Sequence, residues 1–376
     1  MQILNPGGEW ARWLDAETSS IRRAGRWREL RTLDGGSPNF KLPDGSHAVS
    51  FASNDYLGLS LHPAVISAAQ HAVARWGAGA GASRLVVGSR PVHEELEEAL
   101  ASWRAAEAAL VFPTGYQANI AVLAALGGGT RIVSDELNHA SIIDGARLSR
   151  AEVTVYRHRD VDHAAELVRS ASGRVLVVSD TVFSMDGDLA PVQGLSEMCA
   201  RHGALLVLDD AHAVFEAEPV HPDADCLRVG TLSKALGSQG GYVVGTRRWV
   251  HLLVNRARPF IFTTALAPAS AAAALAAVSV CQSGEGRDLR AALRRNVDAV
   301  RSGHASPIIA VVLGSEEAAV GASNRLLEEG LLVPAIRPPT VPPGTSRLRV
   351  ALSAAHAMSD VRRLGAALDN LATSLT

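Results

Sequence analysis

The sequence predicts an α/β protein that has a large domain with a mainly parallel seven-stranded sheet and a smaller α+β C-terminal domain. Short apolar runs alternate with helical patterns through the middle of the chain. These runs are apolar on both faces, as strands are when helices cover both sides of a parallel sheet. Towards the C-terminus this alternation gives way to two strands and two helices. The 376 residues allow two or three such units.

Seven apolar segments are predicted as strands of the large sheet, because each is rich in valine, leucine or isoleucine and is bounded by polar or turn-forming residues. They are Leu110–Phe112, Arg131–Ser134, Val153–Tyr156, Val175–Ser179, Leu205–Asp209, Leu227–Gly230 and Tyr242–Val244. Amphipathic patterns predict helices at Tyr116–Leu126 and Val192–His202, and Val92, Leu96, Leu100 and Trp103 fall at helical spacing before the sheet.

We expect an N-terminal helical arm over residues 1–45, a large domain over 46–270 and a small domain over 271–376. The arm is expected to end in a loop with Gly35, Gly36 and Pro38, because glycine and proline interrupt regular structure. In the small domain, strands are predicted at Ile308–Leu313 and Arg347–Leu352, and helices at Glu316–Glu329 and Ser359–Leu371.

Composition excludes several classes of partner. The net charge is −2, with 36 basic and 38 acidic residues interspersed, so no basic stripe indicates nucleic acid. The three cysteines have no metal-ligand spacing, which predicts reduced thiols in a cytoplasmic protein and no metal site. The uncharged run Phe260–Ser283 is rich in Ala, Ser and Thr and contains Pro268, so we expect a buried helix at a domain or subunit contact and no membrane partner.

Polar residues follow three of the predicted strands, at the sheet edge where proteins of this class bind ligands. Asp209 and His212 follow one strand, Ser184 lies after the second, and Lys234 after the third. Each has a common alternative role: a surface lysine, a helix cap, or a surface pair of aspartates. Together they favour one site.

This set suits pyridoxal phosphate (PLP), an aldehyde cofactor that requires a lysine for its Schiff base. Lys234 supplies that amine, and Asp209 supplies a carboxylate to keep the pyridine nitrogen protonated. Gly115 and Tyr116 open a helix after a strand, where backbone N–H groups bind phosphate. His139 could offer a flat π-face above the ring, although a histidine at this position more often only starts a helix.

Five motifs resemble signatures of the α-oxoamine synthase family, over nearly the whole chain from about Ser50 to His356. They are Ser53–Leu59, Asn138–Ser141, Phe183–Asp188, Asp209–His212 and Thr231–Lys234. The resemblance implies the fold-type I PLP-dependent transferase architecture, which is aspartate aminotransferase-like. It also implies a homodimer with active sites shared at the subunit interface.

The resemblance assigns roles to individual residues. Lys234 would carry the cofactor and act as acid and base, Asp209 would hold the pyridinium, and His139 would stack on the ring. His212 and Ser184 would bond the ring's phenolic oxygen. The remaining cofactor contacts would be to the phosphate, and Asn54 and Arg349 would bind the amino acid carboxylate. The phosphate contacts are Gly115, Tyr116 and Thr231, with Thr263 and Thr264 reaching the phosphate in the other subunit.

The segment 336–349 is similar to the branch of the family that makes 8-amino-7-oxononanoate in biotin biosynthesis. Its Arg337-Pro-Pro-Thr340 opening is typical of that branch, and 232–241 is similar to its actinobacterial members. The implied reaction condenses L-alanine with pimeloyl-CoA or a pimeloyl carrier protein and releases CO2 and the free thiol. Arg337, Thr340 and Arg28 are then candidate substrate contacts, although Arg337 could instead only pair with a carboxylate.

One departure concerns the acyl substrate. Family members usually have glycine after the Asp-x-Ala-His motif, whereas here Ala213–Pro219 follows. The segment from there to Thr231 is also shorter than usual. Because alanine and valine do not tolerate the backbone angles that glycine permits, the backbone must take another path. Family members that use glycine or serine with another acyl group, and a non-catalytic PLP-binding homologue, remain alternatives. The Gly-rich 77–84 follows a helical pattern instead of a strand, which argues against a dinucleotide site.

Overall fold

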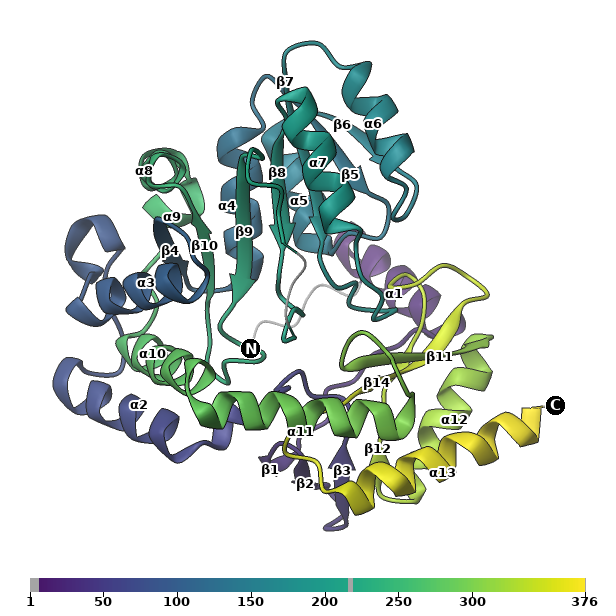
Figure 1. Cartoon of the computed structure of the whole chain (residues 1–376). Helices are drawn as coiled ribbons and strands as arrows, with labels where there is room; N and C mark the ends of the chain where they lie inside the picture. Colours follow the sequence, from purple (N-terminus) through teal and green to yellow (C-terminus); the bar gives the residue numbers. More distant parts are fainter. Residues whose placement is uncertain (1–6, 216–218, 376) are drawn as a thin grey trace.

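The computed structural model describes residues 7–215 and 219–375 and contains the seven-stranded sheet that the sequence predicts (Figure 1). All seven predicted strands are confirmed, with ends that differ by at most two residues. In spatial order the strands are β4 (Ala108–Phe112), β10 (Gly241–Gly245), β9 (Cys226–Thr231), β8 (Leu205–Asp209), β7 (Arg174–Asp180), β5 (Thr130–Asp135) and β6 (Glu152–Tyr156).

The sheet is mainly parallel, as predicted. Strands β9, β8, β7, β5 and β6 pair in parallel, and β10 pairs antiparallel with both β9 and β4. The carboxyl ends of β5, β7, β8 and β9 therefore meet at one edge. This is the edge at which open α/β sheets bind ligands.

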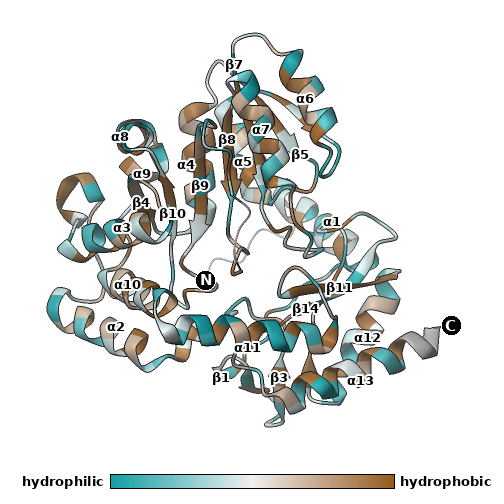
Figure 2. Ribbon diagram, viewed as in Figure 1, coloured by the Kyte–Doolittle hydropathy of each residue, from teal (hydrophilic) through white to brown (hydrophobic). Residues whose placement is uncertain are grey.

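Helices cover both faces of the sheet, which explains why its strands are apolar at successive positions. Ile132 packs into the cluster under α4 (Gly115–Leu126), α5 (Ala140–Ser149), α8 (Arg247–Arg256) and α9 (Arg258–Ile261). Its neighbour Val133 packs on the other face, under α6 (Val161–Arg169) and α7 (Val192–His202). Figure 2 shows these strands as a hydrophobic band between the helical layers.

The uncharged run forms the buried helix α10 (Pro268–Gln282), which begins at Pro268 and packs against two other helices. Those helices are α2 (Pro63–Trp76) and α3 (Pro91–Trp103). The short helical turn η1 (Leu59–Leu61) precedes α2, and η2 (Arg84–Gly88) precedes α3. Ala271, Ala274 and Ala277 are fully buried, because small side chains let the helices approach closely. Within the described part of the chain, no helix has the length and apolarity needed to cross a membrane.

The C-terminal part is the predicted α+β unit, seen at the lower right of Figure 1. Its sheet has the order β11 (Ile308–Gly314), β14 (Ser346–Ala351) and β13 (Ala335–Ile336), and all pairs are antiparallel. Its helices are α11 (Gly284–Val300), α12 (Glu316–Glu328) and α13 (Met358–Leu375).

The N-terminal segment corrects one expectation. Helix α1 (Glu9–Arg23) is followed by a hairpin of β1 (Asp34–Gly36) and β2 (Asn39–Lys41), where a loop was expected. Gly35 has φ +118°, and a Cβ there would lie 2.9 Å from the Asn39 oxygen, so glycine permits the strand pairing. Strand β3 (His47–Ser50) then pairs with β12 (Leu331–Leu332), joining this hairpin to the C-terminal part. The three domain boundaries stay predictions.

Candidate active site

A cavity of about 270 Å³ lies at the carboxyl ends of the parallel strands, close to the lower end of the volumes common for ligand pockets. Seven of the predicted site residues line it, although they come from separate elements. They are Gly115, Tyr116, His139, Asp209, His212, Thr231 and Lys234.

Lys234 lies on a tight turn that follows β9. Its carbonyl oxygen accepts a hydrogen bond from the Gly237 N–H at 2.9 Å. Gly237 has φ +58°, and a Cβ there would overlap the backbone of Ser60, so this turn requires glycine. Burial lowers the pKa of Lys234, although Asp209 and Asp180 oppose the shift. The shift is towards the neutral amine that a nucleophilic lysine needs.

His212 lies between Lys234 and a buried tyrosine. Its Nε2 is 3.0 Å from Nζ of Lys234, and its Nδ1 is 2.6 Å from the hydroxyl of Tyr56. Burial, together with the charges of Lys234 and Arg349, lowers the pKa of His212 well below its ordinary value. The imidazole is therefore neutral, with one ring nitrogen donating and the other accepting.

Asp209 ends β8 and is 4% exposed. Its Oδ2 accepts from Nδ2 of Asn119 at 2.6 Å, and its Oδ1 accepts from the N–H of Ala211 at 2.9 Å. Asn119 also donates to Ser141 Oγ at 2.9 Å. Two fixed donors therefore orient the Asp209 carboxylate inside the cavity.

His139 is the N-cap of α5, which is the common role of a histidine at this position, and its ring also lines the cavity. The ring Nδ1 accepts from the Ser141 N–H at 3.2 Å, while the His139 N–H donates to Asp180 Oδ2 at 2.8 Å. Asp180 lies opposite Asp209 in the sheet. Burial and the nearby Asp209 raise the pKa of Asp180 well above its ordinary value.

The N-terminus of α4 opens into the cavity. Thr114 caps the helix by accepting from the Gln117 N–H at 3.0 Å, so Gly115 and Tyr116 form the first turn, whose N–H groups have no partner within the helix. A Cβ on Gly115 would lie 3.3 Å from Cβ of Thr231. Thr231 in turn donates to the Gly240 carbonyl at 3.0 Å.

Asn54 and Arg349 do not line this cavity, but Tyr56 connects them to it. Nη2 of Arg349 donates to Oδ1 of Asn54 at 3.1 Å, and the Tyr56 hydroxyl lies 3.0 Å from the same oxygen. Arg349 Nε also donates to the carbonyl of Ser184. Tyr56 therefore connects the predicted carboxylate-binding pair to His212 and Lys234.

The other predicted residues do not line the cavity. Thr263 and Thr264 follow α9, next to Ala265, whose N–H donates to the Ala82 carbonyl. Arg337 donates to the Gly25 carbonyl, just after α1, at 2.7 Å, while Thr340 and Arg28 are exposed. Their proposed contacts with cofactor or substrate stay predictions, as does that of Ser184. Part of the shortened segment, residues 216–218, lies outside the described residues.

Three site residues were not singled out from the sequence. Asp180 could have been found, because it ends β7 as Asp209 ends β8. Asn119 lies one helical turn after Gly115, on the side of α4 that faces Asp209. Tyr56 lies in the Ser53–Leu59 motif, but its contact with His212 depends on the tertiary fold.

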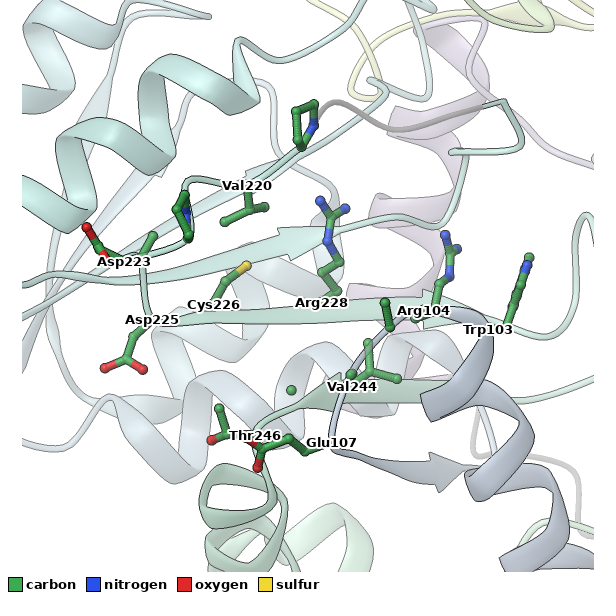
Figure 3. Close-up of a pocket in the computed structure, with 16 residues that line it drawn as sticks. Trp103, Arg104, Glu107, Val220, Asp223, Asp225, Cys226, Arg228, Val244 and Thr246 are labelled. Atoms are coloured by element: carbon green, nitrogen blue, oxygen red, sulfur yellow. The ribbon is translucent and has the colours of Figure 1, made fainter.

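A larger cavity, of about 750 Å³, lies elsewhere (Figure 3). Arg104, Glu107, Asp225 and Thr246 are among the residues around it, near the turn between α3 and β4 and the beginning of β9. It contains none of the predicted site residues. No group of three His, Cys, Asp or Glu side chains in residues 7–215 and 219–375 could hold a metal ion.

Comparisons with known proteins agree with this geometry. The family profile "Aminotransferase class I and II" matches residues 46–368. The chain is 48% identical to 8-amino-7-oxononanoate synthase of Anaeromyxobacter dehalogenans (strain 2CP-1), covering 95% of this chain and 94% of that protein. It is 44% identical to the protein of the same name from Geobacter sulfurreducens, covering 97% and 99%.

Among solved structures, a serine palmitoyltransferase from S. paucimobilis with bound PLP and myriocin is similar. Its TM-score is 0.89 at 28% identity, covering 96% of this chain and 97% of that one. The chain thus has the fold-type I architecture of PLP-dependent transferases. It belongs to the aminotransferase class I and II family and, within it, to the family of the 8-amino-7-oxononanoate synthases.

Proposed function

We propose that the protein is a PLP-dependent acyltransferase that condenses L-alanine with a pimeloyl thioester in biotin biosynthesis. The products are 8-amino-7-oxononanoate, CO2 and free CoA or carrier thiol. The observation that carries the proposal is the Lys234 amine, which shares one cavity with Asp209, His212 and the N-terminus of α4. The relatives at 48% and 44% identity support the choice of substrates.

The residues of the cavity fit PLP. Gly115 leaves the first turn of α4 open beside Thr231, and helix N-termini bind phosphate through their backbone N–H groups. The cavity also contains a half-buried amine, that of Lys234, and a buried carboxylate, that of Asp209, which suit an aldehyde and a ring nitrogen. The Oδ1 atom of Asn119 is buried and has no hydrogen-bond partner among the described residues, as expected of a polar site that receives a ligand.

When bound, PLP supplies an electron sink for the α-carbon of the amino acid. The carboxylate of Asp209, which Asn119 and Ala211 keep in place, would hold a proton on the ring nitrogen. Nζ of Lys234 removes the proton from the α-carbon and later returns one. His212 lies 3.0 Å from that amine and orients it, and the His139 ring lies on another wall of the cavity.

Asn54 and Arg349 bind the carboxylate of L-alanine. Arg349 is only 5% exposed and its guanidinium is held by Ser184 and Asn54, so it is preorganised. In the net reaction, a C–C bond forms between the alanine α-carbon and the acyl carbon, and the C–S bond of the thioester breaks. The amino acid carboxylate leaves as CO2 and a proton takes its place.

Two copies of the chain associate as a homodimer in this proposal. Leu85, Val86 and Val87 on η2 are more than half exposed, and Phe262, just after the neighbouring α9, is 69% exposed. An exposed patch of apolar side chains of this kind supports a contact with another protein chain. Thr263 and Thr264 follow Phe262 directly, and the family resemblance implies that they would reach the other subunit's phosphate.

The test is thiol release from pimeloyl-CoA by PLP-loaded protein, with and without L-alanine, and with glycine or L-serine in its place. Release that requires alanine and yields the mass of 8-amino-7-oxononanoate supports the proposal. Release only with glycine or serine would assign the protein to another α-oxoamine synthase activity. A spectral response to alanine without any release would exclude this acyl donor.

A further inference from the structure

His158, in the turn between β6 and α6, lies between two carboxylates. Its Nδ1 is 2.9 Å from Asp135 Oδ1, and its Nε2 is 2.8 Å from Asp188 Oδ2. Ionised carboxylates only accept hydrogen bonds, so both ring nitrogens must donate. His158 is therefore a positively charged imidazolium that joins two negatively charged groups.

One end of this bridge is fixed to the large sheet. Asp135 ends β5, and its side chain is 1% exposed. Its Oδ1 accepts from the Leu137 N–H and its Oδ2 from the Arg159 N–H, both at 2.9 Å. The His158 N–H also donates to Glu136 at 2.8 Å. The imidazolium is therefore held against the end of β5 from several sides.

The other end is the segment 183–188, which follows β7 and contains Ser184. Asp188 contacts both His158 and Arg159, the latter at 3.2 Å. The ring of Phe183 meets His158 edge to face, with centroids 4.3 Å apart. His158 thus contacts both the first and the last residue of the segment.

The same segment also contacts residues of the C-terminal part of the chain. Arg349 donates to the Ser184 carbonyl, and Arg347 pairs with Asp186. Ser306 Oγ donates to the Gly187 carbonyl at 2.6 Å. The segment 183–188 therefore lies between the His158 bridge and the arginine that also contacts Asn54.

We infer that His158 is a positioning residue for the amino acid site, because it fixes the segment whose Ser184 carbonyl holds Arg349 in place. This inference rests on the proposed function, in which Arg349 and Asn54 bind the alanine carboxylate. Burial alone lowers the pKa of His158, but the hydrogen bonds that it donates to Asp135 and Asp188 outweigh burial and raise the pKa to about 9. The charged bridge thus persists at neutral pH.

The test compares His158 with His163, a nearby histidine in the first turn of α6. His158→Gln removes the charge and one of the two donors. His163→Gln is the matched control, because the His163 ring accepts from the Arg157 N–H at 3.0 Å and contacts neither carboxylate of the bridge. The dissociation constant of L-alanine is measured at neutral pH from the change that it causes in the visible absorption of the PLP-loaded protein.

A rise of about tenfold or more for His158→Gln, with less than a twofold change for His163→Gln, is the expected result. Asp188→Asn should weaken alanine binding similarly. The double variant should bind alanine no more weakly than the single variant with the lower affinity, because both changes break the same contact between His158 and Asp188. If His158→Gln does not fold, Asp188→Asn decides the question.

Two negative results have different meanings. If the wild type responds to alanine, and folded His158→Gln and Asp188→Asn respond at the same concentrations, the inference is wrong while the proposed function stands. If the wild type binds PLP but its spectrum does not respond to alanine, the proposed function is wrong and the inference falls with it.

Discussion

The Nε2 atom of His212 lies 3.0 Å from Nζ of Lys234, while the other ring nitrogen lies 2.6 Å from the Tyr56 hydroxyl. Tyr56 is fully buried, and burial raises its pKa to about 12, so its hydroxyl keeps its proton. A neutral phenol, a neutral imidazole and the lysine amine therefore form one hydrogen-bonded chain inside the site.

Tyr56→Phe should lower kcat/KM for alanine by about tenfold or more, because a buried nitrogen of His212 loses its partner while the ring still fills the same space. The matched control is Tyr242→Phe, which removes another buried tyrosine hydroxyl, one that accepts from Arg104 outside the cavity. Steady-state kinetics over a range of pH, with circular dichroism to verify folding, checks this. Equal losses in the two variants would contradict a specific role for Tyr56.

The two neighbouring carboxylates should respond differently to amidation. Asp209→Asn removes a negative charge from the cavity and should reduce kcat by about 100-fold or more. Asp180→Asn should change kcat by less than about fivefold, because the raised pKa of Asp180 already favours the neutral acid and the amide oxygen can still accept from His139. A larger loss for Asp180→Asn than for Asp209→Asn would reverse these assignments.

Gly237→Ala should destabilise the turn that carries Lys234. The residue has φ +58°, and its Cβ would overlap the backbone of Ser60, so the free energy of unfolding should fall by about 1–3 kcal/mol. Gly128→Ala is the control, because a Cβ there has nothing within 4 Å. Urea denaturation compares the two. If Gly237→Ala were as stable as Gly128→Ala, the turn would not require glycine at position 237.

The bridge at His158 predicts a pH dependence of stability. The pKa is raised from its ordinary 6.5 to about 9 in the folded protein, so its stabilisation is fully present below pH 6.5 and is lost as the pH rises through about 9. The difference in Tm between the wild type and His158→Gln should therefore shrink between pH 7 and 10. A difference that stays constant over this range would show that His158 does not carry the charge.

The large sheet is predictable from the sequence because runs such as Val175–Ser179 are buried on both faces and therefore stand out as apolar. The antiparallel direction of β10 and the pairing of β3 with β12 are not predictable in this way. They depend on contacts between distant segments, for which local pattern carries no signal. The hairpin at Gly35 is not predictable either, because glycine commonly interrupts regular structure, whereas here it permits close strand approach.

Some residues of the site can likewise be predicted from the sequence, and others cannot. Asp209 and Lys234 can be found from their positions after apolar strands, and the structure places both in one cavity. Tyr56 and His158 act through tertiary contacts, with His212 and with Asp188, that no spacing in the sequence reveals. Arg337, Thr340 and Arg28 were proposed as substrate contacts from the family resemblance, and in this structure they lie outside the cavity.

The most direct test of the central claim is to find where the cofactor attaches. The chain has only two lysines, Lys41 on the exposed strand β2 and Lys234 in the cavity. The PLP-loaded protein is reduced with borohydride, digested and analysed by mass spectrometry. The added mass is expected on Lys234 alone, and no stable adduct is expected in Lys234→Ala. Attachment at Lys41, or no attachment in protein that releases thiol with alanine, would contradict it.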